Sequence, residues 1–214
     1  MARSGVLIIL TRTPVAGKTK TRLIPALGAE GAVRLHRKML LRTIEIACQS
    51  DFTCCELHAW PDTQHDFLQQ LSMQFSVGIH AQKGKNLGER MYNAVSRALK
   101  RYDFVVIVGC DIPLLNLPDL NHAHAILQQQ QADAVLGPSE DGGYYLIGMD
   151  RVEPSLFQGL RWGSVDVVDY TRAKLAECGW SCMETSILWD VDDHTDLVKL
   201  QHCPGFENEW QMPV

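Results

Sequence analysis

The sequence lacks any apolar run long enough to cross a membrane or to form the core of a secretion signal. Its first apolar run, residues 6–10 (VLIIL), is short, whereas a membrane helix needs about 18 apolar residues or more. No later segment approaches that length. We therefore expect a chain that begins at Met1, has no membrane anchor and stays in the cytoplasm.

A disulfide framework and an excess of positive charge are also missing. The seven cysteines are an odd number and include the adjacent Cys54 and Cys55, which favours reduced thiols over a secreted disulfide scaffold. The formal net charge of -5 gives no basis for a nucleic-acid or anionic-membrane partner. Phosphate chemistry would have to depend on a few local cations.

The composition is that of an ordinary globular protein. With 46% hydrophobic and 21% charged residues among 214, the chain can bury a sizeable core. Open α/β sheets often reach this length without splitting, so we expect a single domain over residues 1–214.

Short apolar runs alternate with segments whose apolar residues recur at helical spacing. We predict strands at residues 6–10, 54–60, 77–81, 104–108, 134–137, 144–149 and 182–189. We predict helices at residues 29–48, 62–73, 87–99, 117–131 and 165–177. This order predicts a three-layer, doubly wound α/β fold with a mostly parallel sheet, which binds ligands beyond the carboxyl ends of its strands.

The loop after the first predicted strand is rich in cations. Its candidate phosphate-binding residues are Thr11, Arg12, Lys18, Lys20 and Arg22. The core Gly17-Lys18-Thr19 imitates a P-loop, but the glycine required five residues earlier is Arg12, which disfavours a kinase or ATPase. The alternative is a solvated basic loop without function.

Acidic residues follow two further predicted strands. Asp111, in GCDIP, suits Mg²⁺ or Mn²⁺, which prefer carboxylate and phosphate oxygens; alternatively it caps a turn. Asp190 and Asp192 lie two apart at the end of a predicted strand, so both carboxylates share one face and are candidate metal ligands. Asp193 is the alternative cap of a following helix.

Two weaker candidate segments complete the set. In residues 137–145 (GPSEDGGYY), paired glycines allow close approach of a ligand, and the acids can bind hydroxyls or accept a proton; a plain Asp-Gly turn is the alternative. The candidates there are Glu140, Asp141, Gly142, Gly143 and Tyr144. Gln82 and residues 86–90 either contact a base or start a helix. Trp60, Trp180 and Trp189 are expected in the core.

Five segments together carry a family resemblance. They are PVAGKTKTRL (14–23), NLGERM (86–91), GCDIP (109–113), GPSEDGGYYLIG (137–148) and DVDDHTDL (190–197). In this order they resemble the GT-A-type glycosyltransferase-like family DUF2064, related to molybdopterin and phospholactate nucleotidyltransferases. The resemblance implies the nucleotide-diphospho-sugar transferase fold.

The resemblance also implies roles for individual residues. Asp111 takes the family's metal-binding acid position and Asp192 the late metal-ligand position. Lys18, Lys20 and Arg22 match the phosphate-binding segment. Gln82 and Gly88 match positions that touch the base, and Asp141, Gly142 and Gly143 match positions that touch the acceptor or sugar.

We therefore predict a metal-dependent transferase that uses a nucleoside triphosphate or nucleotide sugar and a small-molecule acceptor, with Asp111, Lys18, Arg22 and Asp141 as the catalytic residues. GCDIP has one acid where many glycosyltransferases have an Asp-x-Asp pair, which slightly favours nucleotidyl transfer to a phosphorylated small molecule. Sugar transfer, with Asp141 or Glu140 as general base, and a non-catalytic nucleotide-binding module are the alternatives. A homodimer is left open.

Overall fold

The computed structural model describes residues 3–207 and contains one seven-stranded sheet in the order β3-β2-β1-β4-β6-β5-β7. The strands are β1 (Gly5–Arg12), β2 (Cys54–Trp60), β3 (Gly78–Ala81), β4 (Phe104–Gly109), β5 (Ala134–Pro138), β6 (Tyr144–Met149) and β7 (Cys182–Glu184). The helices are η1 (Thr21–Leu23), α1 (Ile24–Ala47), α2 (Asp66–Phe75), α3 (Leu87–Ala98), α4 (Leu117–Gln128), η2 (Pro154–Phe157), α5 (Val167–Glu177) and α6 (His194–Leu200). The predicted α/β class is confirmed.

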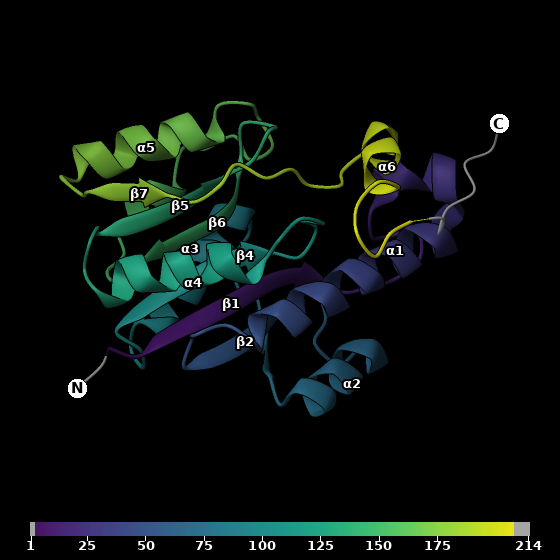
Figure 1. The fold of residues 1–214 in the computed structure, drawn as a ribbon, viewed down its shortest axis with the longest axis horizontal. Helices are drawn as coiled ribbons and strands as arrows, with labels where there is room; N and C mark the ends of the chain where they lie inside the picture. The colour runs from purple at the N-terminus through teal and green to yellow at the C-terminus, as the bar shows by residue number, and fades with distance from the viewer. Residues whose placement is uncertain (1–2, 208–214) are drawn as a thin grey trace.

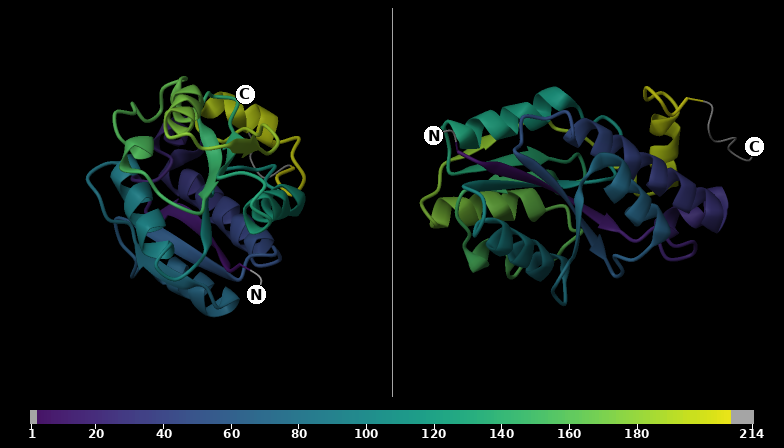
Figure 2. Two further views of the ribbon diagram at one scale, coloured as in Figure 1. Left: turned by 90° about the vertical axis from the view of Figure 1, so that its left-hand side faces the viewer. Right: turned by 90° about the horizontal axis from the view of Figure 1, so that it is seen from below.

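The sheet is mixed but mostly parallel, and helices cover both faces (Figures 1 and 2). β1 pairs in parallel with β2 and β4, whereas β6 runs antiparallel to β4 and β5. Along β1, Leu7 and Ile9 pack with α1, α2 and α4, while Val6 and Ile8 pack with α3 and α5. Burial on both faces explains why the sequence of β1 is continuously apolar.

The strand order also fixes where a ligand can bind. β2 and β3 lie on one side of β1, and β4 lies on the other. The chain therefore changes direction across the sheet between β1 and β4. In open α/β sheets, such a switch point opens a crevice at the carboxyl ends of the two strands.

Of the predicted element boundaries that differ from the structure, three differ most. α2 begins at Asp66, capped by His65, and not at residue 62. α1 begins at Ile24, before residue 29, because a turn of helix continues from η1 up to a break at Gly28, where φ is 69° and ψ is 167°. β7 ends at Glu184, because the described chain beyond it makes a single isolated β-bridge, between Leu188 and Ser139, in place of a continued strand.

Near the end of the described chain, α6 lies beside the beginning of α1 (Figures 1 and 2). A separate apolar cluster holds it there, with Leu23, Trp189, Val191, Leu197 and Phe206 among its buried members. Burial of these side chains stabilises this arrangement. It also carries residues 190–192 to the loop that follows β1.

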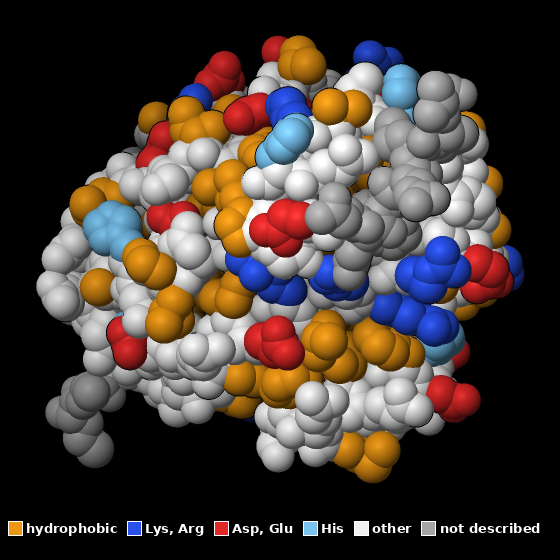
Figure 3. All heavy atoms as spheres, turned by 45° about the vertical axis from the view of Figure 1, so that its right-hand side comes forward, with side chains coloured by type: hydrophobic (Ala, Val, Ile, Leu, Met, Phe, Trp, Pro, Cys, Tyr) orange, Lys and Arg blue, Asp and Glu red, His pale blue; other side chains and the backbone are white. Residues whose placement is uncertain are grey.

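The surface carries both signs of charge. On the face that presents α1 and α6, lysine and arginine side chains form a band flanked by acidic and apolar side chains (Figure 3). The large apolar side chains most exposed among the described residues are Met73, Val165 and Ile187, from separate segments. No helix within residues 3–207 is long and apolar enough to span a membrane.

Candidate active site

A cleft of about 820 Å³ opens at the carboxyl ends of β1 and β4, at the switch point of the sheet. It brings together residues that are far apart in the sequence. Its polar and aromatic lining includes Thr11, Arg12, Lys20, Arg22, His36, Trp60, Gln82, Lys85, Arg90, Asp111, Asp141, Gly143, Tyr144, Trp162, Asp190 and Asp192. Most of the residues predicted from sequence therefore line one cavity.

On the β4 side of the cleft, Lys20 lies among three carboxylates. Its Nζ donates hydrogen bonds to Asp111 Oδ2, at 2.8 Å, and to the backbone carbonyl of Val191, and lies 3.7 Å from Asp192 Oδ1. Asp190 lines the cleft beside them. We call Lys20, Asp111, Asp190 and Asp192 the carboxylate cluster.

The local backbone explains why Lys20, and not Lys18, enters this cluster. The Thr19 hydroxyl donates to the Thr13 carbonyl at 2.7 Å, which closes the loop behind β1. Lys20 then adopts a left-handed conformation, with φ 50° and ψ 47°, immediately before η1. That conformation is uncommon for a residue other than glycine, and here it accompanies an inward side chain with 9% exposure.

The charges of Lys20 and Asp111 stabilise each other. Burial lowers the pKa of Lys20, but its attraction and hydrogen bond to Asp111, with Asp192 adding to them, raise the pKa above its ordinary value. Burial likewise raises the pKa of Asp111, and the nearby Lys20 ammonium outweighs it, so the pKa of Asp111 is lowered. Both groups are therefore charged at neutral pH.

Asp190 behaves differently from its neighbours. Burial, followed by repulsion from Asp111 and Asp141, raises the pKa of the Asp190 carboxyl to about 6. Within residues 3–207, the one side-chain hydrogen bond of its carboxylate is a long one, 3.5 Å from the Ser139 hydroxyl. The cluster therefore has more negative charge than its cations neutralise, which is the condition under which a carboxylate attracts a further cation.

Asp192 and Asp193 make different contacts. Asp192 accepts a hydrogen bond from the exposed Arg22 guanidinium. Asp193 caps α6 and forms a capping box with Asp196, as the alternative for that residue proposed. Residues 190–192 are not in a strand, so the prediction that they share a strand face is wrong, although Asp190 and Asp192 both line the cleft.

The floor of the cleft contains a buried histidine that the sequence did not single out. His36 Nε2 lies 3.0 Å from the Arg12 carbonyl and 3.2 Å from Thr11 Oγ1, which also accepts from the Cys110 thiol at 3.4 Å. Burial lowers the pKa of His36 to about 4, so the ring is neutral. Gln82 Nε2 donates to the Thr11 carbonyl at 3.0 Å. No sequence signal separates His36 from the apolar residues on the same helical face.

On the β2 side of the cleft, two arginines share one aromatic ring. The guanidinium carbons of Arg12 and Arg90 lie 4.9 and 4.8 Å from the centroid of the Trp60 ring. We call Arg12 and Arg90 the arginine pair. The expectation that Trp60 is a core residue is wrong, since it lines the cleft, whereas Trp180 and Trp189 are buried.

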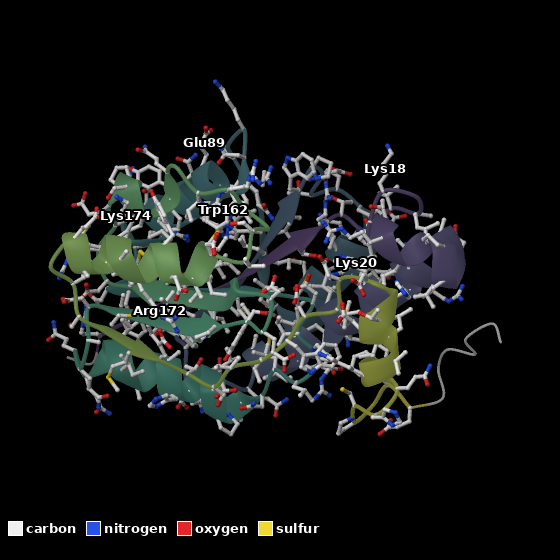
Figure 4. All side chains as sticks on the ribbon, turned by 90° about the horizontal axis from the view of Figure 1, so that it is seen from above. Lys18, Lys20, Glu89, Trp162, Arg172 and Lys174 are labelled. Atoms are coloured by element: carbon white, nitrogen blue, oxygen red, sulfur yellow. The ribbon has the colours of Figure 1, made fainter. Side chains whose placement is uncertain are left out.

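Four predicted residues lie elsewhere or serve packing. Lys18 points outward from the loop, whereas Lys20 lies inside (Figure 4), and Lys18 is not among the described residues that line the cleft. Glu140 pairs with Lys199 at 3.0 Å. A Cβ on Gly88 would lie 2.2 Å from the Phe157 carbonyl oxygen, and one on Gly142 would lie 2.0 Å from that of Val165. These glycines therefore allow the segment around Trp162 to pack over the sheet.

A second group of potential metal ligands lies outside the cleft. The ligand atoms of Glu56, His58 and His80 lie within 4.8 Å of one another, the one such group of three among residues 3–207. However, Arg101 donates to Glu56 Oε1 at 2.6 Å, and Arg97 Nη2 lies 3.2 Å from His58 Nε2. A metal ion would have to displace or approach these cations, so we interpret the group as a buried ion-pair network.

The carboxylate cluster is the better match to magnesium or manganese. Mg²⁺ usually binds one or two carboxylates, substrate phosphates and water, and does not need an all-protein cage. Asp111 and Asp192 provide two carboxylates that are 33% and 50% exposed at the cleft. The Lys20 ammonium lies within 4 Å of both, so a metal ion would share these two carboxylates with Lys20.

Several solved structures resemble this chain over most of its length. A candidate nucleotide-diphospho-sugar transferase from Desulfovibrio desulfuricans G20 is 29% identical, with a TM-score of 0.84 over 95% of this chain and 90% of that one. A CMP-2-keto-3-deoxy-manno-octonic acid synthetase complexed with CTP is 12% identical, with a TM-score of 0.58 over 92% and 97% of the chains.

Glucosyl-3-phosphoglycerate synthase from Mycobacterium tuberculosis, in complex with Mn²⁺, UDP and glucosyl-3-phosphoglycerate, is 8% identical, with a TM-score of 0.58 over 92% and 75% of the chains. The two distant likenesses show the fold alone: this chain has a nucleotide-diphospho-sugar transferase-like fold. A search of curated proteins finds no match.

The family resemblance read from the five sequence segments is confirmed by a match over residues 43–164, more than half of the 214 residues. The matched region contains Trp60, Gln82, Arg90, Asp111 and Asp141, all of which line the cleft. The chain therefore belongs to the DUF2064 family, described as "Uncharacterized protein conserved in bacteria".

Proposed function

We propose that this protein is a metal-dependent transferase that uses a nucleoside triphosphate and transfers its nucleotidyl group to a phosphorylated small molecule. One observation carries the proposal: Asp111, Asp190 and Asp192 converge with Lys20 and Arg22 in a single cleft at the sheet's switch point. Carboxylates that hold a metal and cations that bind phosphate oxygens are the parts that phosphoryl chemistry requires.

Asp111 and Asp192 are the residues that would hold Mg²⁺ or Mn²⁺. When bound, the ion would neutralise charge on the phosphate oxygens. Lys20 and Arg22 add two positive charges at the same place, and Lys20 is held by its hydrogen bond to Asp111. Preorganised charges of this kind stabilise a transition state without rearranging during the reaction.

The acceptor would approach along the part of the cleft that Asp141 and Gly143 line. The Asp141 carboxylate accepts a hydrogen bond from the Gly143 backbone at 2.9 Å, which fixes its position. A phosphate acceptor brings its own nucleophilic oxygen and needs no general base. In nucleotidyl transfer, Asp141 would therefore orient the acceptor.

The comparisons support the class of reaction. Solved structures with this fold include a synthetase complexed with CTP and a synthase complexed with Mn²⁺ and UDP. The GCDIP segment has one acid, Asp111, after β4, where many glycosyltransferases have an Asp-x-Asp pair. This difference favours nucleotidyl transfer over sugar transfer.

The test is pyrophosphate release. The protein is incubated with each nucleoside triphosphate, Mg²⁺ or Mn²⁺ and a panel of phosphorylated acceptors, and pyrophosphate is measured. We expect release that depends on both acceptor and metal. Consumption of a nucleotide sugar, with no pyrophosphate from any triphosphate, would overturn the proposal.

Sugar transfer is the second candidate, because the 29% identical structure is a candidate nucleotide-diphospho-sugar transferase and Asp141 faces the cleft. In an inverting glycosyltransferase, Asp141→Asn would stop transfer while nucleotide-sugar binding survives, since only proton abstraction from the acceptor is lost. In a nucleotidyltransferase the same substitution would mainly raise the KM for the acceptor. Measuring kcat and KM of Asp141→Asn distinguishes the two reactions.

A further inference from the structure

Three side chains from three elements meet on the β2 side of the cleft. Arg12 is the last residue of β1, and Trp60 is the last residue of β2, paired with it in the sheet. Arg90 comes from the beginning of α3. Both guanidiniums lie over the Trp60 ring, at 4.9 and 4.8 Å, and Lys85 also lines the cleft.

In the described part of the chain, these cations have no acidic partner. Among residues 3–207, no carboxylate oxygen forms an ion pair with Arg12, Lys85 or Arg90, whereas Lys20 and Arg22 both have one. The acid next to Arg90 in sequence, Glu89, accepts hydrogen bonds from the Lys85 backbone at 2.9 Å and from the Asn86 side chain. Figure 4 shows Glu89 at the outer edge of the molecule.

Arg90 is placed where its charge is uncompensated. Burial, together with the positive charge of Arg12, lowers the pKa of the Arg90 guanidinium. Its Nε is buried and has no hydrogen-bond partner. A buried donor without an acceptor costs free energy, and two like charges that share a ring repel each other. An anion with several oxygens would accept a hydrogen bond from the unpaired donor and reduce the repulsion between the two guanidiniums, because guanidinium groups bind phosphate in a bidentate manner.

We propose that Arg12 and Arg90, gathered on the indole of Trp60, form with Lys85 of the cleft lining a phosphoryl-binding subsite on the β2 side of the cleft. The ligand is a phosphate group, carried either by the nucleotide or by the acceptor. The proposal rests on the proposed function for the identity of these two substrates. Binding of the phosphate group itself requires neither the metal nor the carboxylate cluster.

The alternative is that the arginines only support the fold by stacking. Cation–π contacts stabilise a fold, so a purely structural role predicts that loss of Arg90 lowers stability without affecting ligand binding. The subsite predicts the reverse, because removal of one guanidinium relieves repulsion in the free protein. Stability and anion affinity together therefore separate the two explanations.

The experiment measures inorganic pyrophosphate binding by calorimetry, in EDTA and at low ionic strength. Variants are Arg12→Gln and Arg90→Gln; the matched control is Lys100→Gln, which removes one positive charge just beyond the far end of α3. We expect each arginine variant to bind pyrophosphate about tenfold more weakly or worse. Lys100→Gln should bind as wild type does, and the unliganded Tm of Arg90→Gln should not fall.

Several results would overturn the subsite. One is wild-type affinity for pyrophosphate in both arginine variants, and another is no binding by the wild-type protein. A lowered unliganded Tm with unchanged affinity in Arg90→Gln would show that the stack is structural.

Two further titrations identify the source of the phosphate, with a nucleoside triphosphate and with glycerol phosphate as probes. A loss in Arg90→Gln confined to the triphosphate assigns the subsite to the nucleotide, and a loss confined to the phosphomonoester assigns it to the acceptor. If no transferase activity is found but Arg90→Gln still loses pyrophosphate affinity, the proposed reaction fails and the subsite stands. If the protein is an active nucleotidyltransferase and Arg90→Gln keeps wild-type affinity for pyrophosphate, the proposed reaction stands and the subsite fails.

Discussion

The two sides of the cleft differ in whether their positive charges have carboxylate partners. On the β4 side, Lys20 contacts Asp111 and Asp192, and Arg22 pairs with Asp192. On the β2 side, the arginine pair shares the Trp60 ring and has no carboxylate within ion-pair distance among residues 3–207. The cations of the first side hold the site together, whereas those of the second side are available to a ligand. Breaking the buried pair of Lys20 and Asp111 on the β4 side should therefore cost stability as well as affinity, whereas removing Arg12 or Arg90 on the β2 side should cost affinity alone.

The largest expected effect is that of Asp111→Asn. Loss of a residue that only hydrogen-bonds to a metal ligand typically lowers metal affinity by roughly 10- to 100-fold. Because Asp111 is proposed to be a ligand itself, its loss should lower metal-dependent nucleotide affinity by more than that. The free energy of unfolding should also fall by about 1–3 kcal/mol, because Lys20, with 9% exposure, loses its charged partner. Calorimetry with Mg²⁺ and nucleotide, and urea unfolding, measure the two effects.

A double variant separates these effects. Asp111→Asn combined with Lys20→Met removes the uncompensated ammonium, so stability should recover while nucleotide binding stays lost. If Asp111→Asn alone binds nucleotide with magnesium as tightly as wild type, the assignment of Asp111 as a metal ligand is wrong.

Arg22→Ala should have the next largest effect. Binding of a nucleoside diphosphate should weaken by about 1.5–3 kcal/mol, the scale of a hydrogen bond to a charged group, whereas binding of the nucleoside should not change. Stability should change little, because the Arg22 side chain is 73% exposed and exposed ion pairs contribute about 0–1 kcal/mol. Equal losses for nucleoside and diphosphate would show that Arg22 does not contact phosphate.

Asp190→Asn tests the excess negative charge on the β4 side. The pKa of Asp190 is about 6 in the folded protein, above its ordinary value of 3.8, so the folded state binds this proton more tightly than the unfolded state. The group therefore lowers stability as pH rises from about 4 to above 6. The free energy of unfolding of Asp190→Asn, relative to that of the wild type, should therefore increase by on the order of 1 kcal/mol between pH 4 and pH 8. Urea unfolding at the two pH values measures this difference. Parallel pH profiles of the two proteins would contradict the raised pKa.

The smallest effect is expected for Lys18→Gln. Lys18 is exposed and points away from the cleft (Figure 4), so its charge is screened by solvent and salt. Nucleotide affinity should stay within about threefold of wild type, and stability within about 0.5 kcal/mol. A loss as large as that of Arg22→Ala would mean that the loop turns Lys18 toward phosphate when nucleotide binds.

Much of the fold could be predicted because it depends on local patterns. The continuous apolar run at residues 6–10 and the helical spacing after Leu87 reflect burial in the final structure. Boundaries were less predictable where tertiary contacts decide them. The extended segment after Glu184 leaves the sheet, and α1 is prolonged toward η1 across Gly28.

The site was predictable only as a set of loops. Asp111, Asp190 and Asp192 come after predicted strands, so their approach to one another follows from the topology. Which cation meets them does not follow, because it depends on the left-handed backbone of Lys20.

The sequence by itself determined the layer architecture, the family and the loops that carry the chemistry, because strand and helix periodicity and short motifs are local properties of the chain. The tertiary structure alone decided which charges are compensated. Trp60 and Arg90 meet Arg12 because α3 packs beside the ends of β1 and β2, and Lys20 meets Asp192 because the C-terminal segment folds back onto α1. Electrostatic energy depends on distance and burial in the folded chain, and the sequence states neither.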